Sequence, residues 1–216
     1  MSDHAVKETE QQATPKKGIS SRTRKITVIG MLSAAAYVIM MFQLEVPFLV
    51  PTFIKLDFAE LPALIGAFAL GPVEGVLICL VKNLLHALRT TTGGVGELSN
   101  FILGASFVFT AGMIYKFKKN RKTAIIGSVI GALVMALVSI PSNYFITYPF
   151  YMNFMPIEQI IAAYQEIISR VGGSVNGLLE CLILFNAPFT FLKGMCSAII
   201  TFLIYKKISP IIKGTN

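Results

Sequence analysis

The sequence predicts an all-α membrane protein with six transmembrane helices, and three observations support this class. Hydrophobic residues make up 54% of the 216 residues and charged residues only 14%, whereas roughly a quarter of the residues in a soluble domain are charged. Several uncharged runs approach or exceed the length of about 20 residues that a helix needs to cross a bilayer. Basic residues gather in clusters between these runs, as they do in cytoplasmic segments.

Four long apolar runs are predicted to cross the membrane, because each is near or above about 18 residues in length; the last of them contains one charged residue, Lys193. These runs are residues 26–43, 98–115, 123–150 and 182–205. A fifth run, residues 61–81, is either one helix or a hairpin of two shorter helices broken at Gly71-Pro72. Its length alone does not decide between the two.

Charge decides between these alternatives. Most Lys and Arg residues fall in three clusters, one up to Lys25, one within 116–122 and one from Lys206 onward. The positive-inside rule places all three in the cytoplasm, so an even number of crossings must separate the first cluster from the second. Only a hairpin, with helices at about 59–70 and 73–91, gives an even number. We therefore expect six crossings with both termini in the cytoplasm.

The predicted spans define the organisation of the chain. Residues 1–24 are polar and predict a disordered cytoplasmic tail. Residues 25–208 form the predicted six-helix transmembrane domain, and residues 209–216 a short cytoplasmic tail. No cleavable signal peptide is recognisable, and we expect a multi-pass protein of a bacterial cell membrane.

The predicted topology places three segments outside, at residues 44–60, 90–97 and 151–181. The first contains Pro47 and Pro51 and interleaves apolar with charged residues. It is either an interfacial loop on the lipid headgroups or a semi-rigid flap over a pocket, where prolines reduce the entropy lost on binding. The third contains a predicted amphipathic helix at 156–169, for which we expect packing first and gating second.

Lys193 is the strongest functional candidate because it lies deep in the last predicted helix. An ionisable residue inside a span costs about 2.5–3.5 kcal/mol on insertion scales and is by default a functional hypothesis. The structural alternative is that Lys193 snorkels to the interface or pairs with Glu74 or Glu180. Both acidic residues are expected near helix ends, so a functional role is favoured.

Polar side chains also converge in the outer halves of the last three predicted helices. The residues placed there are Asn100, Asn143, Asn186 and Thr190. One buried amide is weak evidence, since interhelical hydrogen bonds are common and contribute about 0.6 kcal/mol each. Together they predict a pocket that opens outward and combines polar groups with an apolar and aromatic lining.

No enzymatic motif competes with this interpretation. The sequence contains neither an HExxH motif nor a P-loop, so we expect no ATP site in this chain. Its Cys and His residues lack metal-ligand spacing, and neither catalytic residues nor a metal site nor a cofactor is expected. A small membrane enzyme acting on lipids is an alternative from another class, but the acidic residues and His86 are too scattered along the chain to favour it.

Seven short stretches carry a resemblance to a known family. They are MLSAAAYV, KLDFAELPAL, GPVEG, LVKNLL, NFILGASF, SNYF and PFTFLKG. Over about residues 25–207 the chain resembles the riboflavin-specific S component, which is the substrate-binding membrane subunit of energy-coupling factor (ECF) transporters. The resemblance implies an ECF S-component-like fold. It also implies high-affinity binding of riboflavin, or of FMN, at the extracellular side, and uptake together with a coupling membrane protein and two ATPase subunits.

The resemblance further implies ligand contacts from the first external loop and the last two helices, at Ile54, Lys55, Leu56, Asp57, Asn143, Thr190 and Lys193. Lys and Asn donors suit the carbonyls and ring nitrogens at one edge of a flavin. Thr190 stands where the family usually has Asn, with Asn186 one turn away as a substitute. Lys55 stands where Thr is frequent, and a lysine near the mouth would favour a phosphorylated flavin such as FMN.

Two questions stay open at this point. Small residues on the first helix are the predicted docking face for the coupling protein, at Gly30, Ala34, Ala35 and Ala36, but packing within the chain explains them equally well. The ligand could also be another vitamin, such as thiamine, biotin or a folate. No nucleic-acid partner is expected, since the net charge of +8 follows from the membrane topology.

Overall fold

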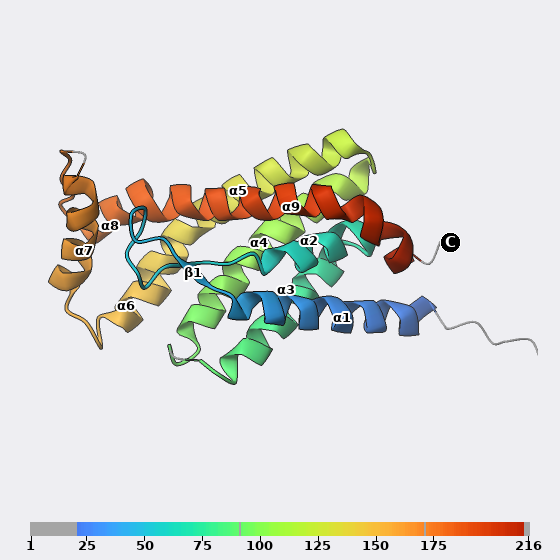
Figure 1. Ribbon diagram of the computed structural model, residues 1–216, viewed down its shortest axis with the longest axis horizontal. Helices are drawn as coiled ribbons and strands as arrows, with labels where there is room; N and C mark the ends of the chain where they lie inside the picture. The colour runs from blue at the N-terminus through green and yellow to red at the C-terminus, as the bar shows by residue number, and fades with distance from the viewer. Residues whose placement is uncertain (1–20, 91, 171, 214–216) are drawn as a thin grey trace, which may run out of the picture.

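The computed structural model describes residues 21–90, 92–170 and 172–213, which form a mainly helical protein (Figure 1). In chain order the elements are α1 (Ser21–Met41), β1 (Leu44–Glu45), β2 (Lys55–Leu56), α2 (Glu60–Ala69), α3 (Pro72–Ala87), α4 (Val95–Phe117), α5 (Arg121–Ser142), the π-helical turn η1 (Asn143–Thr147), α6 (Tyr148–Tyr151), α7 (Ile157–Ser169), α8 (Leu178–Cys181), the π-helical turn η2 (Leu182–Asn186) and α9 (Ala187–Lys213). Of the two predicted tails, positions 1–20 and 214–216 lie outside the described residues.

Within the described residues, four helical segments are long and apolar enough to cross a membrane. They are Arg22–Met41, Val95–Phe117, Arg121–Tyr151 and Leu178–Lys206, and they overlap the four long predicted spans. The fifth predicted region is two helices, α2 and α3. Gly71 between them adopts a φ of 141°, which L side chains rarely adopt, and Pro72 begins α3. The predicted break at Gly71-Pro72 is therefore confirmed.

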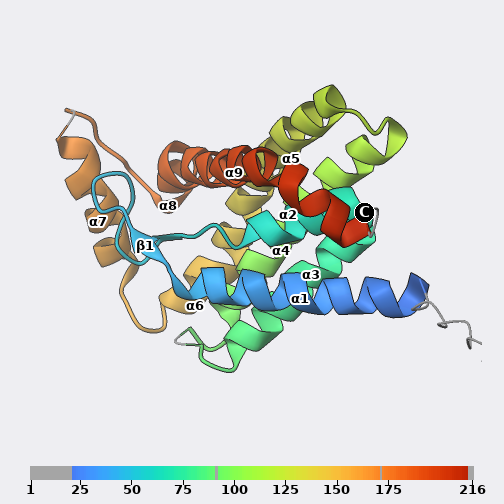
Figure 2. The same cartoon turned by 45° about the vertical axis from the view of Figure 1, so that its right-hand side comes forward.

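The two ends of the molecule differ in charge. Figures 1 and 2 show the start of α1, the α4–α5 connection and the end of α9 at one end, and α7, α8 and β1 at the other. The first end carries basic residues of all three clusters, including Lys25, those within 116–122, and Lys206. This asymmetry along the long helices is the one that the positive-inside rule expects.

Two of the long helices contain a wide turn that sequence patterns did not predict, since residues 123–150 and 182–205 were each expected to form one regular helix. Pro149 follows η1 and Pro188 follows η2, each two residues after the last residue of the turn. In a regular helix each proline ring would collide with the carbonyl four residues earlier, which lies inside the wide turn. Widening moves that carbonyl aside, and the N–H of Tyr148 bonds instead to the carbonyl of Asn143, five residues back.

The first external segment contains a short antiparallel ribbon. β1 pairs with β2, with Leu44 opposite Leu56 and Glu45 opposite Lys55. Between the strands the chain turns back on itself, and Val50 is buried at its centre. The ribbon runs directly into α2, so this segment is tied to the helical bundle at both ends (Figure 1).

α7 confirms the predicted amphipathic helix at 156–169. Ile160 and Tyr164 are buried in a cluster with residues of α6, α8 and η2, whereas Glu158 and Glu166 are exposed. The helix lies at the end of the molecule opposite the basic clusters (Figure 1). Packing is thus its first role, as predicted.

The small residues of α1 divide into two groups. Gly30, Ala34 and Ala35 are exposed, whereas Ala36 is fully buried in the main core of the bundle. The Ala36 methyl group packs against this chain's own helices, so its inclusion in the predicted docking face was wrong.

Candidate ligand-binding site

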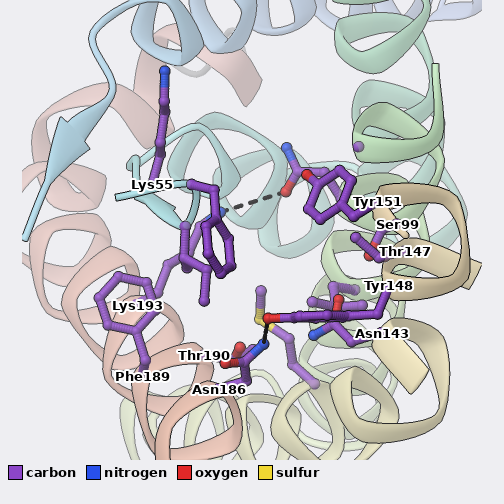
Figure 3. A pocket seen from close by; sticks show the side chains of 16 residues that line it. Lys55, Ser99, Asn143, Thr147, Tyr148, Tyr151, Asn186, Phe189, Thr190 and Lys193 are labelled. Atoms are coloured by element: carbon purple, nitrogen blue, oxygen red, sulfur yellow. Dashed lines mark hydrogen bonds between the residues drawn. The ribbon is translucent and has the colours of Figure 1, made fainter. Parts of the chain in front are cut away.

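A cavity of about 160 Å³ opens between the end of the first external segment and helices α4, α5 and α9 (Figure 3). Polar side chains from β2, α4, η1, η2 and α9 line it. They are Lys55, Ser99, Asn100, Asn143, Thr147, Asn186, Thr190 and Lys193. The remaining lining is mainly apolar or aromatic, and comprises Phe53, Ile54, Gly96, Leu103, Met135, Tyr148, Tyr151 and Phe189. A largely apolar wall with a few convergent polar groups is typical of small-molecule sites.

The two π-helical turns supply much of the polar lining. Asn143 and Thr147 are the first and last residues of η1, and Asn186 is the last residue of η2. Wide turns of this kind occur frequently at functional sites, because the extra residue redirects the side chains that follow. The proline-induced widening described above therefore helps to aim these groups at the cavity.

Seven of the nine predicted ligand-binding residues line the cavity. They are Ile54, Lys55, Asn100, Asn143, Asn186, Thr190 and Lys193. The other two, Leu56 and Asp57, do not line it. Leu56 follows Lys55 in the strand and therefore points to the opposite face, and Asp57 contacts the cavity only through Lys193.

Sequence patterns missed several lining residues, among them Phe53, Ser99, Thr147, Tyr148 and Tyr151. The aromatic ones resemble ordinary residues of the membrane interface. Thr147 could have been predicted from the sequence, because it follows Asn143 by four residues and residues at this spacing lie on the same side of a helix.

Lys193 lies between three acceptors from three different elements. Its Nζ donates to Asp57 Oδ2 at 2.9 Å and to Asn100 Oδ1 at 3.4 Å, and it lies 3.6 Å from Glu60 Oε2. The Lys193 side chain is almost wholly buried. A buried charge has lost its water shell and is stable only when it is paired and hydrogen-bonded, which these three acceptors provide. The first external segment, α2 and α4 thus all meet at one side chain of α9.

Asp57 carries a negative charge in this arrangement. Burial by itself would raise the pKa of its carboxyl group, but the positive charges of Lys193 and Lys82 and the hydrogen bonds from the Ala59 N–H and from Lys193 lower the pKa below its ordinary value. Asp57 is therefore an anchor for the ammonium of Lys193 at neutral pH.

Glu60 and Lys82 form a second buried ion pair beside the first. Lys82 Nζ donates to Glu60 Oε1 at 2.8 Å, and both side chains are fully buried. The alternative partners considered for Lys193 are engaged elsewhere, which makes that pairing wrong. Glu74 binds Lys25 at 3.0 Å, and Glu180 accepts the N–H of Asn176.

Asn186 belongs to a closed ring of hydrogen bonds with two buried tyrosines. The Tyr164 hydroxyl donates to Asn186 Oδ1 at 2.6 Å, and Asn186 Nδ2 donates to the Tyr148 hydroxyl at 3.1 Å. The two hydroxyl groups also contact each other. The ring ties α7 to α6 and η2, and burial raises the pKa of Tyr164 well above its ordinary value, so this hydroxyl stays protonated.

Lys55 is placed differently from the other polar lining residues. Its Nζ lies 3.9 Å from Glu45 Oε1 on the neighbouring strand, and both side chains are about half exposed. Figure 3 shows its ammonium pointing away from Asn186, Thr190 and Asn143. Lys55 therefore borders the mouth of the cavity.

His86 at the end of α3 and Glu97 at the start of α4 also meet near the cavity wall. His86 Nδ1 lies 2.8 Å from Glu97 Oε1, and Glu97 Oε2 accepts hydrogen bonds from Thr90 and Thr92. This cluster closes the α3–α4 connection next to Gly96. Within the described residues, no group of three or more His, Cys, Asp and Glu side chains is placed to hold a metal ion.

The sequence matches relatives of known name over most of its length. It is 35% identical over 192 residues to the riboflavin transporter RibU of Staphylococcus aureus (strain TCH60), with 89% of this chain and 94% of the relative covered. It is 26% identical over 192 residues to the riboflavin transporter FmnP of Bacillus subtilis (strain 168), with 88% and 94% covered.

A solved structure and a family model agree with these relatives. The structure, described as the S component of a bacterial ECF transporter, has a TM-score of 0.68 and 33% sequence identity, covering 89% of this chain and 99% of that one. The model of the family "ECF transporter, substrate-specific component" matches residues 24–205. The chain therefore belongs to the substrate-specific components of ECF transporters.

Proposed function

We propose that this chain captures riboflavin with high affinity at the outer side of a bacterial cell membrane and takes it up together with an ECF energising module. The cavity carries the proposal, because it joins a lysine ammonium, amides, hydroxyls and aromatic rings in one small site. The relatives named riboflavin transporters match nearly the whole chain, which supports a flavin over thiamine, biotin or a folate.

The chemistry of the lining suits a flavin ring. One edge of the ring presents carbonyl oxygens and nitrogens, which would accept hydrogen bonds from Lys193 and from the amides of Asn100 and Asn143. The flat ring system and its dimethylbenzene end would pack against aromatic side chains such as Phe53 and Phe189. We place the polar edge toward α9, where Lys193 lies.

Of Thr190 and Asn186, Thr190 is the better candidate for direct contact with the ligand. The Asn186 carbonyl oxygen already accepts from Tyr164, and its amide donates to Tyr148, so a ligand contact would have to compete with these bonds. Thr190 lines the cavity one turn further along. Asn186 then supports the site by fixing its neighbours.

A second hollow continues the cavity outward and bears on the choice between riboflavin and FMN. It has a volume of about 260 Å³ and shares Phe53, Lys55 and Tyr151 with the first cavity. The sugar-alcohol chain of riboflavin would extend into it. The ammonium of Lys55 at its border would attract the phosphate of FMN, so FMN is the second candidate ligand.

We further propose that the chain crosses the membrane six times, with α2 and α3 as the second and third crossings. The described basic residues of all three clusters lie at the end away from the cavity, which supports cytoplasmic termini and a cavity that opens outward. The ten residues of α2 are too few to span a bilayer in contact with lipid, but nearly all of them are buried by neighbouring helices. Residues 25–208 are the proposed transmembrane domain, with both tails in the cytoplasm.

The proposed partners are a coupling membrane protein and two ATPase subunits, as family membership suggests. Gly30, Ala34 and Ala35 are the proposed docking residues, since these small, exposed residues would let another helix approach α1 closely. The absence of a P-loop motif from the sequence fits a subunit that relies on partners for energy. No catalytic role is proposed for any residue.

The absorption spectrum of the protein tests this function most simply. The chain is purified in detergent from cells grown with riboflavin, and about one flavin per chain is expected from the flavin absorption bands. A colourless protein that also leaves the fluorescence of added riboflavin unchanged would remove the flavin assignment. Thiamine, biotin and folate would then be titrated in turn, and FMN competition would follow a positive result.

A further inference from the structure

The buried pair of Glu60 and Lys82 has a feature that a purely structural ion pair would not need. Lys82 satisfies only one oxygen of Glu60, Oε1. The other oxygen, Oε2, is buried, accepts no hydrogen bond from the described residues and lies 3.6 Å from Nζ of Lys193. A buried acceptor without a donor is unfavourable, so its position beside the cavity lysine calls for an explanation.

The packing around Glu60 restricts where its carboxylate can lie. Glu60 begins α2, where the N-terminus of the helix favours a negative charge. On the other side α4 comes close, because Gly104 has no side chain and a Cβ there would lie 3.2 Å from Glu60 Oε1. With Lys82 bound to the same oxygen, the carboxylate cannot turn away from Lys193 without breaking its shortest ion pair.

The formal charges of the four groups in the cluster sum to zero. Asp57 and Glu60 are the acidic members, and Lys82 and Lys193 the basic ones. Without Lys82, two carboxylates would compete for one ammonium beside a cavity that must receive the electron-rich edge of a ligand. Lys82 thus offsets the charge of Glu60 and leaves Lys193 available to a ligand.

We propose that Glu60 and Lys82 are positioning residues for ligand binding: Lys82 holds Glu60, and Glu60 holds the ammonium of Lys193 at the cavity wall. Neither residue lines the cavity, so both act through Lys193. This inference rests on the proposed function, in which Lys193 donates to the bound flavin.

The test is a set of variants that removes the pair without leaving a lone buried charge. Glu60→Gln combined with Lys82→Met keeps the net charge of the cluster, and replacing a buried ion pair as a whole is often neutral for stability. Riboflavin affinity is measured by fluorescence quenching for the wild type, the double variant, Lys193→Met and the triple variant. This scheme is a double-mutant cycle between the pair and Lys193.

A positioning role predicts a loss that depends on Lys193. The double variant is expected to bind riboflavin at least tenfold more weakly than the wild type, while in the Lys193→Met background the same two changes alter affinity less than about twofold. Equal losses in both backgrounds, or no loss in either, would overturn the inference. Lys25→Met combined with Glu74→Gln, a pair at the opposite end of the molecule, is the matched control and should leave affinity unchanged.

Two further measurements test the positioning role if the double variant does not fold or if the wild type does not bind riboflavin. Should the double variant fail to fold, Glu60→Asp retains the charge but withdraws the carboxylate from Lys193, and at least a threefold loss of affinity is expected; an unchanged affinity contradicts the role. Should the wild type not bind riboflavin, the proposed function fails separately. Acetylation of Lys193 by acetic anhydride, followed by mass spectrometry, then decides: at least fivefold faster reaction in the double variant supports the positioning role, and an equal rate overturns it.

Discussion

The ammonium of Lys193 lies 2.9 Å from the carboxylate of Asp57, a residue 136 positions earlier in the chain. Lys193 belongs to α9 and forms part of the cavity wall, whereas Asp57 ends the external segment that carries β1 and β2. Both groups are buried, so water and salt screen their attraction only weakly. This one ion pair therefore fastens the external segment to the bundle and orients the ammonium in the cavity.

Replacing Asp57 with Asn should weaken riboflavin binding by about 10- to 100-fold, equivalent to about 1.4–2.8 kcal/mol. The effect is smaller than the 3–5 kcal/mol typical of breaking a buried ion pair, because Glu60 Oε2 still faces the ammonium. Fluorescence titration measures the affinity, with Asp57→Glu as the charge-retaining comparison. Equal affinity in Asp57→Asn and the wild type would show that this ion pair does not orient Lys193.

The pH dependence of binding should reflect the lowered pKa of Asp57. A carboxyl group with a lowered native pKa stabilises the fold fully above its ordinary pKa of about 3.9, and this contribution disappears as pH falls through the native value. Attraction from Lys193 and Lys82 outweighs burial and lowers the Asp57 pKa, so this group should not weaken binding between about pH 5 and pH 8. The loss should begin only below about pH 4.

The pH experiment compares riboflavin affinity across this range in the wild type and in Asp57→Asn. The variant lacks the titrating group and should miss the acidic loss attributed to it. A wild-type midpoint near pH 6 that vanishes in the variant would contradict the charged state assigned to Asp57.

Tyr164→Phe should loosen α7 through the hydrogen-bond ring. The change removes the hydroxyl that donates to Asn186 Oδ1 and leaves a buried acceptor unpaired, which costs about 1–3 kcal/mol. A lower thermal unfolding midpoint and faster hydrogen exchange in α7 are expected. Tyr144→Phe is the matched control, since Tyr144 is 40% exposed and outside the cavity lining, and a similar effect there would refute the role of the ring.

Ala34→Trp should separate ligand binding from partner docking. A large side chain on the exposed face of α1 would keep a partner helix from close approach while leaving the cavity untouched. Riboflavin binding should persist, but co-purification with the coupling protein and riboflavin uptake should fall at least tenfold. Leu137→Trp, at an exposed position of α5, serves as control; equal behaviour of the two variants would place the docking face elsewhere.

Sequence patterns predicted the long helices and the break at Gly71-Pro72 because both depend on local chemistry. A long apolar run indicates a helix that is buried in lipid. A glycine followed by a proline indicates that one helix ends and the next begins within a few residues. The same reasoning singled out Lys193, since a lysine deep in an apolar run is conspicuous, and its side chain is buried and lines the cavity. Its role in binding stays a prediction.

The partners of Lys193 could not be predicted in this way. Asp57 and Glu60 lie more than 130 positions away in the sequence, and no periodicity connects an external segment with the last helix. The wide turns at η1 and η2 were missed for a different reason. Pro149 and Pro188 were visible, but whether a proline bends, ends or widens a helix depends on the packing around it.

Ala36 shows the limit of arguments from composition. Three adjacent alanines look alike in sequence, yet successive helical residues point about 100° apart, so neighbours face different surroundings. Ala34 and Ala35 are exposed and Ala36 is buried. The orientation of α1 in the bundle, which only tertiary packing defines, decides which of them a partner could touch.

We propose that the cavity beside Lys193 holds the flavin. Titration of riboflavin into the purified wild type and into Lys193→Met, followed by flavin fluorescence quenching, tests it most directly. The wild type should saturate at one flavin per chain, and Lys193→Met should bind at least 100-fold more weakly, equivalent to about 2.8 kcal/mol, while circular dichroism shows the same helix content. Equal affinity in the two folded proteins would contradict the claim and place the flavin elsewhere in the chain.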